Sequence, residues 1–214
     1  MKTPEFIKSA KTMCERMLHD KKYRLAVVRR SHYWFFHYYF WHYVKFKTAE
    51  FQRKMFAMTE RELLQTIAIT AFRGSGKSTI MNMSFILWAI LGFRQKKFIL
   101  IVGRTQAQAR QHHSNIRKEL EENKLLERDL GPFKEIEDEW RNSCLVIPKY
   151  GAKIMAVSMD QAVRGLRHGQ YRPDLIICDD IEDLDSVKTL ESRDNTYRWV
   201  KGELIPAGDT ETTI

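Results

Sequence analysis

Residues 71–79, Ala-Phe-Arg-Gly-Ser-Gly-Lys-Ser-Thr, constrain the fold of this chain more than any other segment. Gly76, Lys77 and Ser78 match the end of a phosphate-binding loop. In such a loop, backbone N–H groups surround the phosphates, the lysine reaches the β and γ oxygens, and the hydroxyl ligates magnesium. The segment therefore predicts a site for a nucleoside triphosphate.

The loop departs from the common pattern at two positions. Ala71 stands where the first glycine is expected, and an arginine, Arg73, lies inside the loop. Gly74 and Gly76 remain where the backbone has to approach phosphates closely, so the loss of one glycine leaves the phosphate cradle intact.

The neighbouring residues supply the context that a phosphate loop requires. Residues 64–70, Leu-Gln-Thr-Ile-Ala-Ile-Thr, predict a short buried strand, and residues 79–91 predict a helix. A strand, a loop and a helix in this order favour a real site over a chance glycine-rich turn. The residues expected to hold the nucleotide phosphates are Arg73, Gly74, Ser75, Gly76, Lys77, Ser78 and Thr79.

An apolar run that ends in acids, residues 175–180, predicts the second half of the site. Asp179 would hold magnesium together with Ser78, because the charge of the triphosphate has to be neutralised as the γ-phosphoryl leaves. Asp180 stands where a catalytic carboxylate would orient the attacking water. Its side chain is shorter than the usual glutamate, so Glu182 or Asp183 could take this role. For these two acids, an acidic helix start is the alternative.

The order of predicted elements indicates an α/β fold. Strands alternate with helices, and the strands are almost continuously apolar, which predicts a mostly parallel sheet flanked by helices on both faces. Beyond the loop, strands are predicted at 97–103, 144–147, 153–157 and 174–178, and helices at 106–122 and 186–204. We expect two parts, a basic and aromatic helical segment at 1–45 and an ATPase domain at 46–214.

The amino-terminal part is basic and then aromatic. Residues 1–30 hold nine Lys and Arg against three acids, and the whole chain carries a formal charge of +9, which fits a polyanionic partner. A solvated helix face is the alternative for the basic segment. The aromatic residues of 33–43 could stack on the bases of single strands, but a run without a period favours packing of this segment against the core.

The cysteines, the histidines and the hydropathy of the chain do not indicate a disulfide-rich, metal-binding or membrane-spanning protein. Three isolated cysteines without metal-ligand spacing predict a reduced compartment, and the spacing of His32, His37 and His42 does not predict a metal site. The longest apolar run, residues 80–93, is shorter than the ~20 residues that cross a bilayer, so we expect no membrane partner.

Three segments resemble the ATPase region of the large terminase subunit, the motor that packages DNA into tailed bacteriophages. They are the arginine-containing phosphate loop, Val163-Arg164-Gly165, and the run Arg-Pro-Asp-Leu-Ile-Ile-Cys-Asp-Asp-Ile-Glu-Asp at 172–183. The resemblance covers roughly residues 45–214. It implies a P-loop NTPase fold of the RecA-like (ASCE) kind, with the helical lead-in preceding it.

The resemblance assigns roles to individual residues. Arg73 would contact the γ-phosphate within its own subunit, and Arg164 would be an arginine finger that reaches the nucleotide of a neighbouring subunit. A surface or DNA-facing arginine is the alternative for Arg164. Phe51 and Gln52 resemble the aromatic-glutamine element that reads adenine in related motors, and an ordinary exposed glutamine is the alternative.

The resemblance also implies cofactors and partners. ATP and magnesium (Mg2+) would be bound, and hydrolysis would drive double-stranded DNA into a procapsid. The partners would be a homo-oligomeric ring, the portal protein and the small terminase subunit, in the cytoplasm of the host of a phage or prophage. Related motors continue with a coupling motif and a nuclease domain. Because residues 212–214 would only begin the next strand, no nuclease is expected within this sequence.

Two other functions are compatible with the same motifs. A helicase or assembly ATPase of nucleic acids would share both nucleotide motifs, but the further motifs of a second RecA-like lobe are not found. A non-catalytic scaffold would bind the nucleotide for structural reasons and use its basic, aromatic amino-terminal part to hold nucleic acid or a protein.

Overall fold

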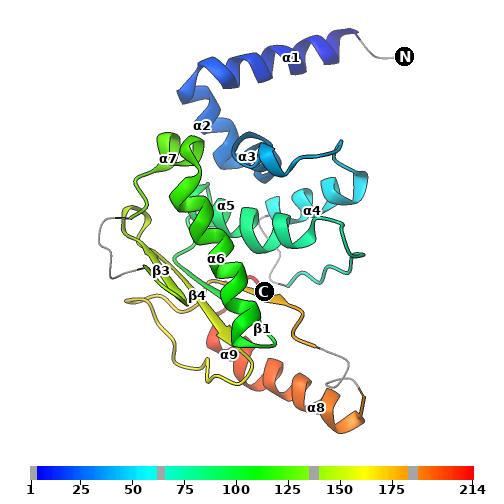
Figure 1. Ribbon diagram of the computed structural model, residues 1–214, viewed down its shortest axis with the longest axis vertical. Helices are drawn as coiled ribbons and strands as arrows, with labels where there is room; N and C mark the ends of the chain where they lie inside the picture. The colour runs from blue at the N-terminus through cyan, green and yellow to red at the C-terminus, as the bar shows by residue number, and fades with distance from the viewer. Residues whose placement is uncertain (1–3, 62–65, 135–139, 183–187) are drawn as a thin grey trace.

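The computed structural model describes residues 4–61, 66–134, 140–182 and 188–214, and its amino-terminal part is helical (Figure 1). The elements of this part are α1 (Pro4–His19), α2 (Lys21–Arg30), α3 (His32–Tyr39), the 3-10 turn η1 (Trp41–Tyr43) and α4 (Glu50–Glu60). The side chain of Ser31 caps α3 by accepting a hydrogen bond from the Trp34 N–H. Its own backbone is extended, so α2 and α3 are separate helices. The predicted helical lead-in is confirmed for the described residues.

The aromatic residues after α2 lie mainly inside the molecule. Four of them are buried: Phe35, Phe36, Tyr39 and Phe40. They belong to one hydrophobic core with the helix that follows residues 71–79, whereas Trp41 is 59% and Tyr43 42% exposed. The expectation that this segment packs the amino-terminal helices against the rest of the chain is confirmed, because seven of its nine Phe, Trp and Tyr rings are buried in this core or packed partly buried against it.

The sheet of the described residues has five strands. In spatial order they are β2 (Trp140–Arg141), β3 (Cys144–Ile147), β4 (Ala152–Ser158), β1 (Phe98–Gly103) and β5 (Leu175–Asp179). These bounds agree closely with the strands predicted from apolar runs. The short strand β2 was not predicted.

The sheet is mixed, and the prediction of a mostly parallel sheet was wrong in this respect. β1 runs parallel to β4 and β5, whereas β3 is antiparallel to both β2 and β4. Only the 3-10 turn η4 (Pro148–Tyr150) and Gly151, at φ +57°, connect β3 to β4. A connection this short joins antiparallel neighbours, whereas parallel strands need a crossover of a dozen or more residues.

Helices cover both faces of the sheet. After α4 these are η2 (Thr79–Phe85), α5 (Ile86–Leu91), α6 (Gln106–Glu122), α7 (Lys124–Leu130), α8 (Leu190–Trp199), η5 (Val200–Leu204) and α9 (Ile205–Ala207), of which η2 and η5 are π-helical. Ile99 of β1 faces a core shared with η2, α5, α6 and α7. Leu100 faces the opposite core, which contains Leu204. Figure 1 shows α6 lying across β1 and β4.

The helices around the sheet follow the predictions. The helix predicted at 79–91 is formed by η2 and α5, and the helix predicted at 106–122 is α6. The helix predicted at 186–204 is present from Leu190, and its residues 186 and 187 lie outside the described residues.

The buried strand predicted at 64–70 was wrong for its described part, residues 66–70, which form no regular element. Residues 64 and 65 lie outside the described residues. The Ile67 N–H donates to the carbonyl of Ile214 at 2.8 Å, and Thr213 forms a parallel bridge with Leu175 of β5. The last residues of the chain therefore lie between 66–70 and β5. In the described part, the bond from Ile67 to Ile214 does not extend into a ladder along 66–70.

Among the described helices, none combines the length and the apolar character that a membrane span requires. The longest apolar run of the sequence instead forms η2 and α5, and residues 80–91 are all buried in the core.

Candidate functional site

The loop 71–79 leads directly into helix η2. Gly74 and Gly76 have φ angles of +84° and +80°, in the left-handed region where glycine is favoured over any residue with a Cβ. The Ile80 N–H donates to the carbonyl of Gly76 at 2.9 Å, so the helix begins at the end of the loop. The two glycines that the sequence retains are those whose backbone conformation requires glycine.

An open cleft of about 590 Å³ lies along this loop. Loop residues and two acids line it: Ala71, Phe72, Arg73, Gly74, Ser75, Gly76, Lys77, Ser78, Thr79, Asp179 and Asp180. The volume is in the range of about 300 to 1,000 Å³ that is typical of small-molecule sites. The two sequence motifs, far apart along the chain, thus meet in one cleft.

Asp179 contacts the loop from the carboxyl end of β5. Lys77 Nζ lies 3.5 Å from Asp179 Oδ1, and Ser78 Oγ donates to Asp179 Oδ2 at 3.5 Å. The Asp179 residue is buried, with 7% of its surface exposed. Its partner in the sheet is Gly103, the last residue of β1, so the carboxyl ends of two parallel strands meet beside the loop.

Two further side chains hold Asp179, and neither was predicted from the sequence. Asn82 Nδ2 donates to Asp179 Oδ2 at 2.5 Å, and His112 Nε2 lies 3.0 Å from the same oxygen. Asn82 follows Ser78 by four residues, which puts both on one face of a helix, so a signal for it was present. His112 belongs to α6, and nothing in its local sequence points to Asp179.

Burial and the neighbouring side chains have opposite effects on the pKa of the Asp179 carboxyl. Burial raises the pKa of its carboxyl, but His112, Lys77 and Asn82 lower it by more, and the pKa is below its ordinary value. The carboxylate is therefore ionised at neutral pH. This is the form that can attract a cation.

The oxygen atoms at the inner end of the cleft suit a hard divalent cation. Ser78 offers a hydroxyl and Asp179 a carboxylate, which are ligand types that Mg2+ accepts. Within the described residues, no group of three or more His, Cys, Asp and Glu is arranged to hold a metal. Mg2+ usually keeps several waters and binds through one or two carboxylates and the phosphates of a substrate, so these two residues fit it only together with a phosphate ligand.

Gln52 reaches the loop from α4. Its Nε2 donates to the carbonyl of Ser75 at 2.8 Å, and its Oε1 accepts from the Ala49 N–H at 3.0 Å. The rings of Phe51 and Phe72 are also in contact, with centroids 5.3 Å apart. The predicted aromatic-glutamine pair is thus beside the loop, and both ends of the Gln52 amide are engaged with the backbone.

The candidate catalytic acids differ in position. Asp180 lines the cleft and has a φ of +47°, a left-handed conformation in which Asn, Asp and His are enriched among non-glycine residues. Glu182 is exposed and is not among the residues that line the cleft. Asp183 lies outside the described residues. The structure therefore brings Asp180, and not Glu182, to the loop.

The two arginines to which the resemblance assigns roles lie in different parts of the molecule. Arg73 is exposed and lines the cleft. Arg164 is not part of the lining: its Nη2 donates to the carbonyl of Gly202, and its Nε lies 3.5 Å from Glu203 Oε2. Its side chain is 58% exposed. Arg164 is thus paired with η5 on the surface of the molecule.

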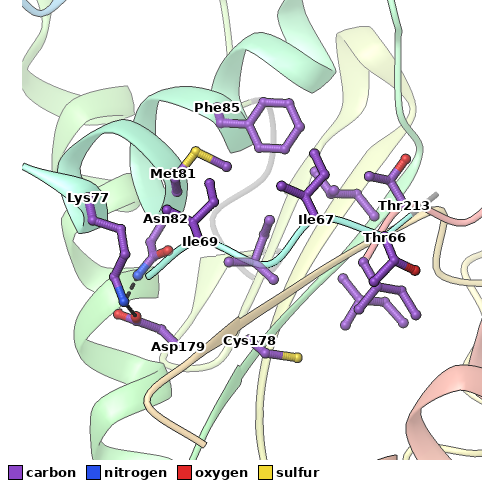
Figure 2. A pocket seen from close by; sticks show the side chains of 14 residues that line it. Thr66, Ile67, Ile69, Lys77, Met81, Asn82, Phe85, Cys178, Asp179 and Thr213 are labelled. Atoms are coloured by element: carbon purple, nitrogen blue, oxygen red, sulfur yellow. Dashed lines mark hydrogen bonds and ion pairs between the residues drawn. The ribbon is translucent and has the colours of Figure 1, made fainter. Parts of the chain in front are cut away.

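A smaller cavity of about 140 Å³ lies behind the loop, between η2 and β5 (Figure 2). Lys77, Asn82 and Asp179 lie at one end of it, and Ile67 and Thr213 at the other. Its remaining walls are mainly apolar, and it shares Lys77 and Asp179 with the open cleft. The carboxylate therefore lies between an apolar interior and a polar cleft, which accounts for its burial.

No protein-family model matches this chain, and no curated protein sequence matches it. The functional evidence is thus its own sequence and the geometry of the cleft.

Proposed function

We propose that the cleft binds ATP with magnesium and hydrolyses it, and that the chain is a P-loop NTPase. The observation that carries this proposal is the meeting of Lys77 and Ser78 with Asp179, at 3.5 Å each, beside a loop with two left-handed glycines. Lys77 would turn from Asp179 to the phosphates, and Ser78 and Asp179 would hold the metal. Magnesium, when bound, neutralises charge on the triphosphate.

The remaining cleft residues would act on the γ-phosphate. Asp180 would orient the attacking water, since it is the second carboxylate in the lining. Arg73, also in the lining, would stabilise charge on the transferring phosphoryl from within the same subunit. Glu182 is the second candidate for the carboxylate role, and its exposed position makes it the weaker one.

We further propose that this is the motor region of a large terminase, which would use hydrolysis to move double-stranded DNA. The support is the resemblance of the three sequence segments and the charge of +9, which favours a polyanion. The exposed position of Arg164 outside its own cleft fits action on a neighbouring subunit of a ring. A portal protein and a small terminase subunit would be its partners, in the host cytoplasm.

ATP hydrolysis by the purified chain, with and without double-stranded DNA and across protein concentration, tests this function. We expect turnover that rises with DNA or with assembly. Lys77→Ala should abolish it, whereas the control Lys118→Ala, an exposed lysine of α6, should leave it intact. Full activity of Lys77→Ala would contradict the proposal.

Mixed assemblies test the arginine finger. Arg164→Ala subunits keep an intact cleft, and Lys77→Ala subunits keep Arg164, so mixing two inactive proteins should restore hydrolysis in part if Arg164 acts across a subunit interface. Arg167→Ala, another exposed arginine, serves as the control and should need no complementation. No recovery under assembling conditions would count against action between subunits.

A nucleotide-binding scaffold is the second candidate function. The observation that favours it is that the carboxylate beside Asp179 is an aspartate, which is shorter than the glutamate usual at this position. Tight binding of ATP without turnover, at every protein and DNA concentration, would support the scaffold. Turnover unaffected by DNA or assembly would instead favour an ATPase that is not a DNA-packaging motor.

A further inference from the structure

The two oxygens of the Asp179 carboxylate have different surroundings. Oδ2 accepts from Asn82 Nδ2 at 2.5 Å and lies 3.0 Å from His112 Nε2. Ser78 Oγ, at 3.5 Å, is a more distant partner of the same oxygen. Oδ1 faces Lys77 Nζ at 3.5 Å, toward the loop (Figure 2). Oδ2 is thus engaged by Asn82 and His112, whereas Oδ1 faces only Lys77 of the loop among the described contacts.

The backbone around His112 fixes where its ring lies. α6 begins just after β1, and the Thr105 side chain caps it by accepting from the Gln108 N–H. At Gly103, an added Cβ would come within 2.9 Å of the Ala109 nitrogen. The start of α6 therefore packs tightly on the end of β1, next to Asp179 in the sheet. The His112 side chain is 20% exposed, and it extends from α6 to Asp179 at the end of β5.

We propose that His112 is a positioning residue for the metal-nucleotide site: with Asn82 it holds Oδ2 of Asp179, so that Oδ1 is presented to the metal. This inference rests on the proposed function. It assigns His112 no contact with the nucleotide, only a hydrogen bond from Nε2 that orients the carboxylate. Groups that orient a metal-binding carboxylate in this way typically change metal affinity by about 10- to 100-fold when they are removed.

A purely structural role is the competing explanation, because the same contact joins α6 to β5. The two roles differ in what they change. A structural contact would alter the stability of the fold, whereas a positioning contact would alter the dependence of nucleotide binding on magnesium. The experiment therefore needs a binding measurement besides activity.

Binding of a fluorescent ATP analogue to the full chain, titrated with Mg2+ and repeated in EDTA, provides that measurement. In His112→Leu and His112→Asn, the Mg2+ concentration for half-maximal tight binding should rise by about 10- to 100-fold. Affinity in EDTA should stay near that of the wild type. His112→Gln should restore the wild-type Mg2+ dependence, because its amide nitrogen can reach the place of Nε2, whereas the asparagine amide falls short.

Gln111→Ala, which changes an exposed neighbour on α6, is the matched control and should behave as the wild type. If the leucine variant does not fold, as judged by thermal melting, the asparagine variant carries the comparison. An unchanged Mg2+ dependence in the folded variants, or a glutamine variant as weak as the leucine variant, overturns the role of His112 alone. A wild-type chain that binds no nucleotide overturns this inference together with the proposed function.

Discussion

Arg24 and Asp129 form a buried, two-pronged ion pair that joins α2 to α7. Arg24 Nε lies 2.7 Å from Asp129 Oδ2, and Nη2 lies 3.0 Å from Oδ1. The hydrogen bond with Asp129 raises the pKa of the guanidinium. Burial raises the pKa of the Asp129 carboxyl, but the bonds from Arg24 and Arg128 lower it to below its usual value. The amino-terminal helices are therefore fixed to the rest of the chain by charge as well as by aromatic packing.

Arg24→Ala should strongly destabilise the fold. In this variant Asp129 keeps its contacts with Arg128 and the Tyr39 hydroxyl. It loses Arg24, which binds both of its carboxylate oxygens. Breaking a buried pair from one side typically costs about 3–5 kcal/mol. Urea denaturation measures this loss. The double variant Arg24→Met, Asp129→Leu should recover much of it, and a single variant as stable as the wild type would contradict the expectation.

Gln52→Ala distinguishes two possible roles of Gln52, which are support of the loop and recognition of adenine. Because Gln52 donates to the carbonyl of Ser75, its loss should loosen the phosphate loop and weaken the binding of ATP and GTP alike, by roughly fivefold for a hydrogen bond of about 1 kcal/mol. Fluorescence titration with both nucleotides measures the effect, with Lys54→Ala of the same helix as the control. A loss confined to ATP would instead indicate that Gln52 reads adenine.

The sequence predicted the elements whose signal is local. The buried strands β1 and β5 and the helix α6 are set by apolar runs and by a capping threonine, which act over a few residues. The loop and Asp179 were singled out because they are the residue types that a phosphate site would need. The structure brings these two motifs together in one cleft, and phosphate binding there stays a prediction.

The failures concern partners that are distant in the sequence. Residues 66–70 have the composition of a strand, but a ladder depends on a neighbouring strand, and in the described part only the Ile67 N–H bonds to Ile214. The contact of His112 with Asp179 depends on how closely α6 packs on β1, which a helical pattern does not specify. The antiparallel β3 follows from the shortness of the 148–151 turn, a signal that was visible but was outweighed by the alternation of strands and helices.

Asp180→Asn should stop turnover and leave ATP binding intact. Asn tolerates the left-handed backbone of this position, so the variant should fold, while the lost carboxylate should lower kcat by about 10² to 10⁴-fold. Glu182→Gln is the matched control and should retain activity, because Glu182 is not part of the cleft lining. Single-turnover hydrolysis with parallel binding titrations distinguishes the two. Loss of turnover in Glu182→Gln alone would transfer the catalytic role to Glu182.

The burial of the neutral His113 ring should make the fold less stable in mild acid. It is buried on the inner side of α6, and among the described atoms its Nε2 has no hydrogen-bond partner. Burial, with a smaller effect of Arg117, lowers its pKa to about 4. In the unfolded chain histidine binds a proton below about pH 6.5, so between this pH and 4 the unfolded state holds more protons and the free energy of unfolding falls as the pH falls.

From pH 7 to pH 5 we expect His113 to contribute a loss of about 2 kcal/mol, from about 1.4 kcal/mol per pH unit below 6.5. His32, which is fully buried between Thr59 and Ser84, has a pKa lowered well below its ordinary value and adds to the slope in the same direction. Denaturant unfolding of His113→Leu at several pH values should give a shallower dependence than the wild type. Gln111→Ala, which changes an exposed residue of α6 that carries no charge, should leave the slope unchanged. Equal slopes in His113→Leu and the wild type would show that this ring is not held neutral by burial.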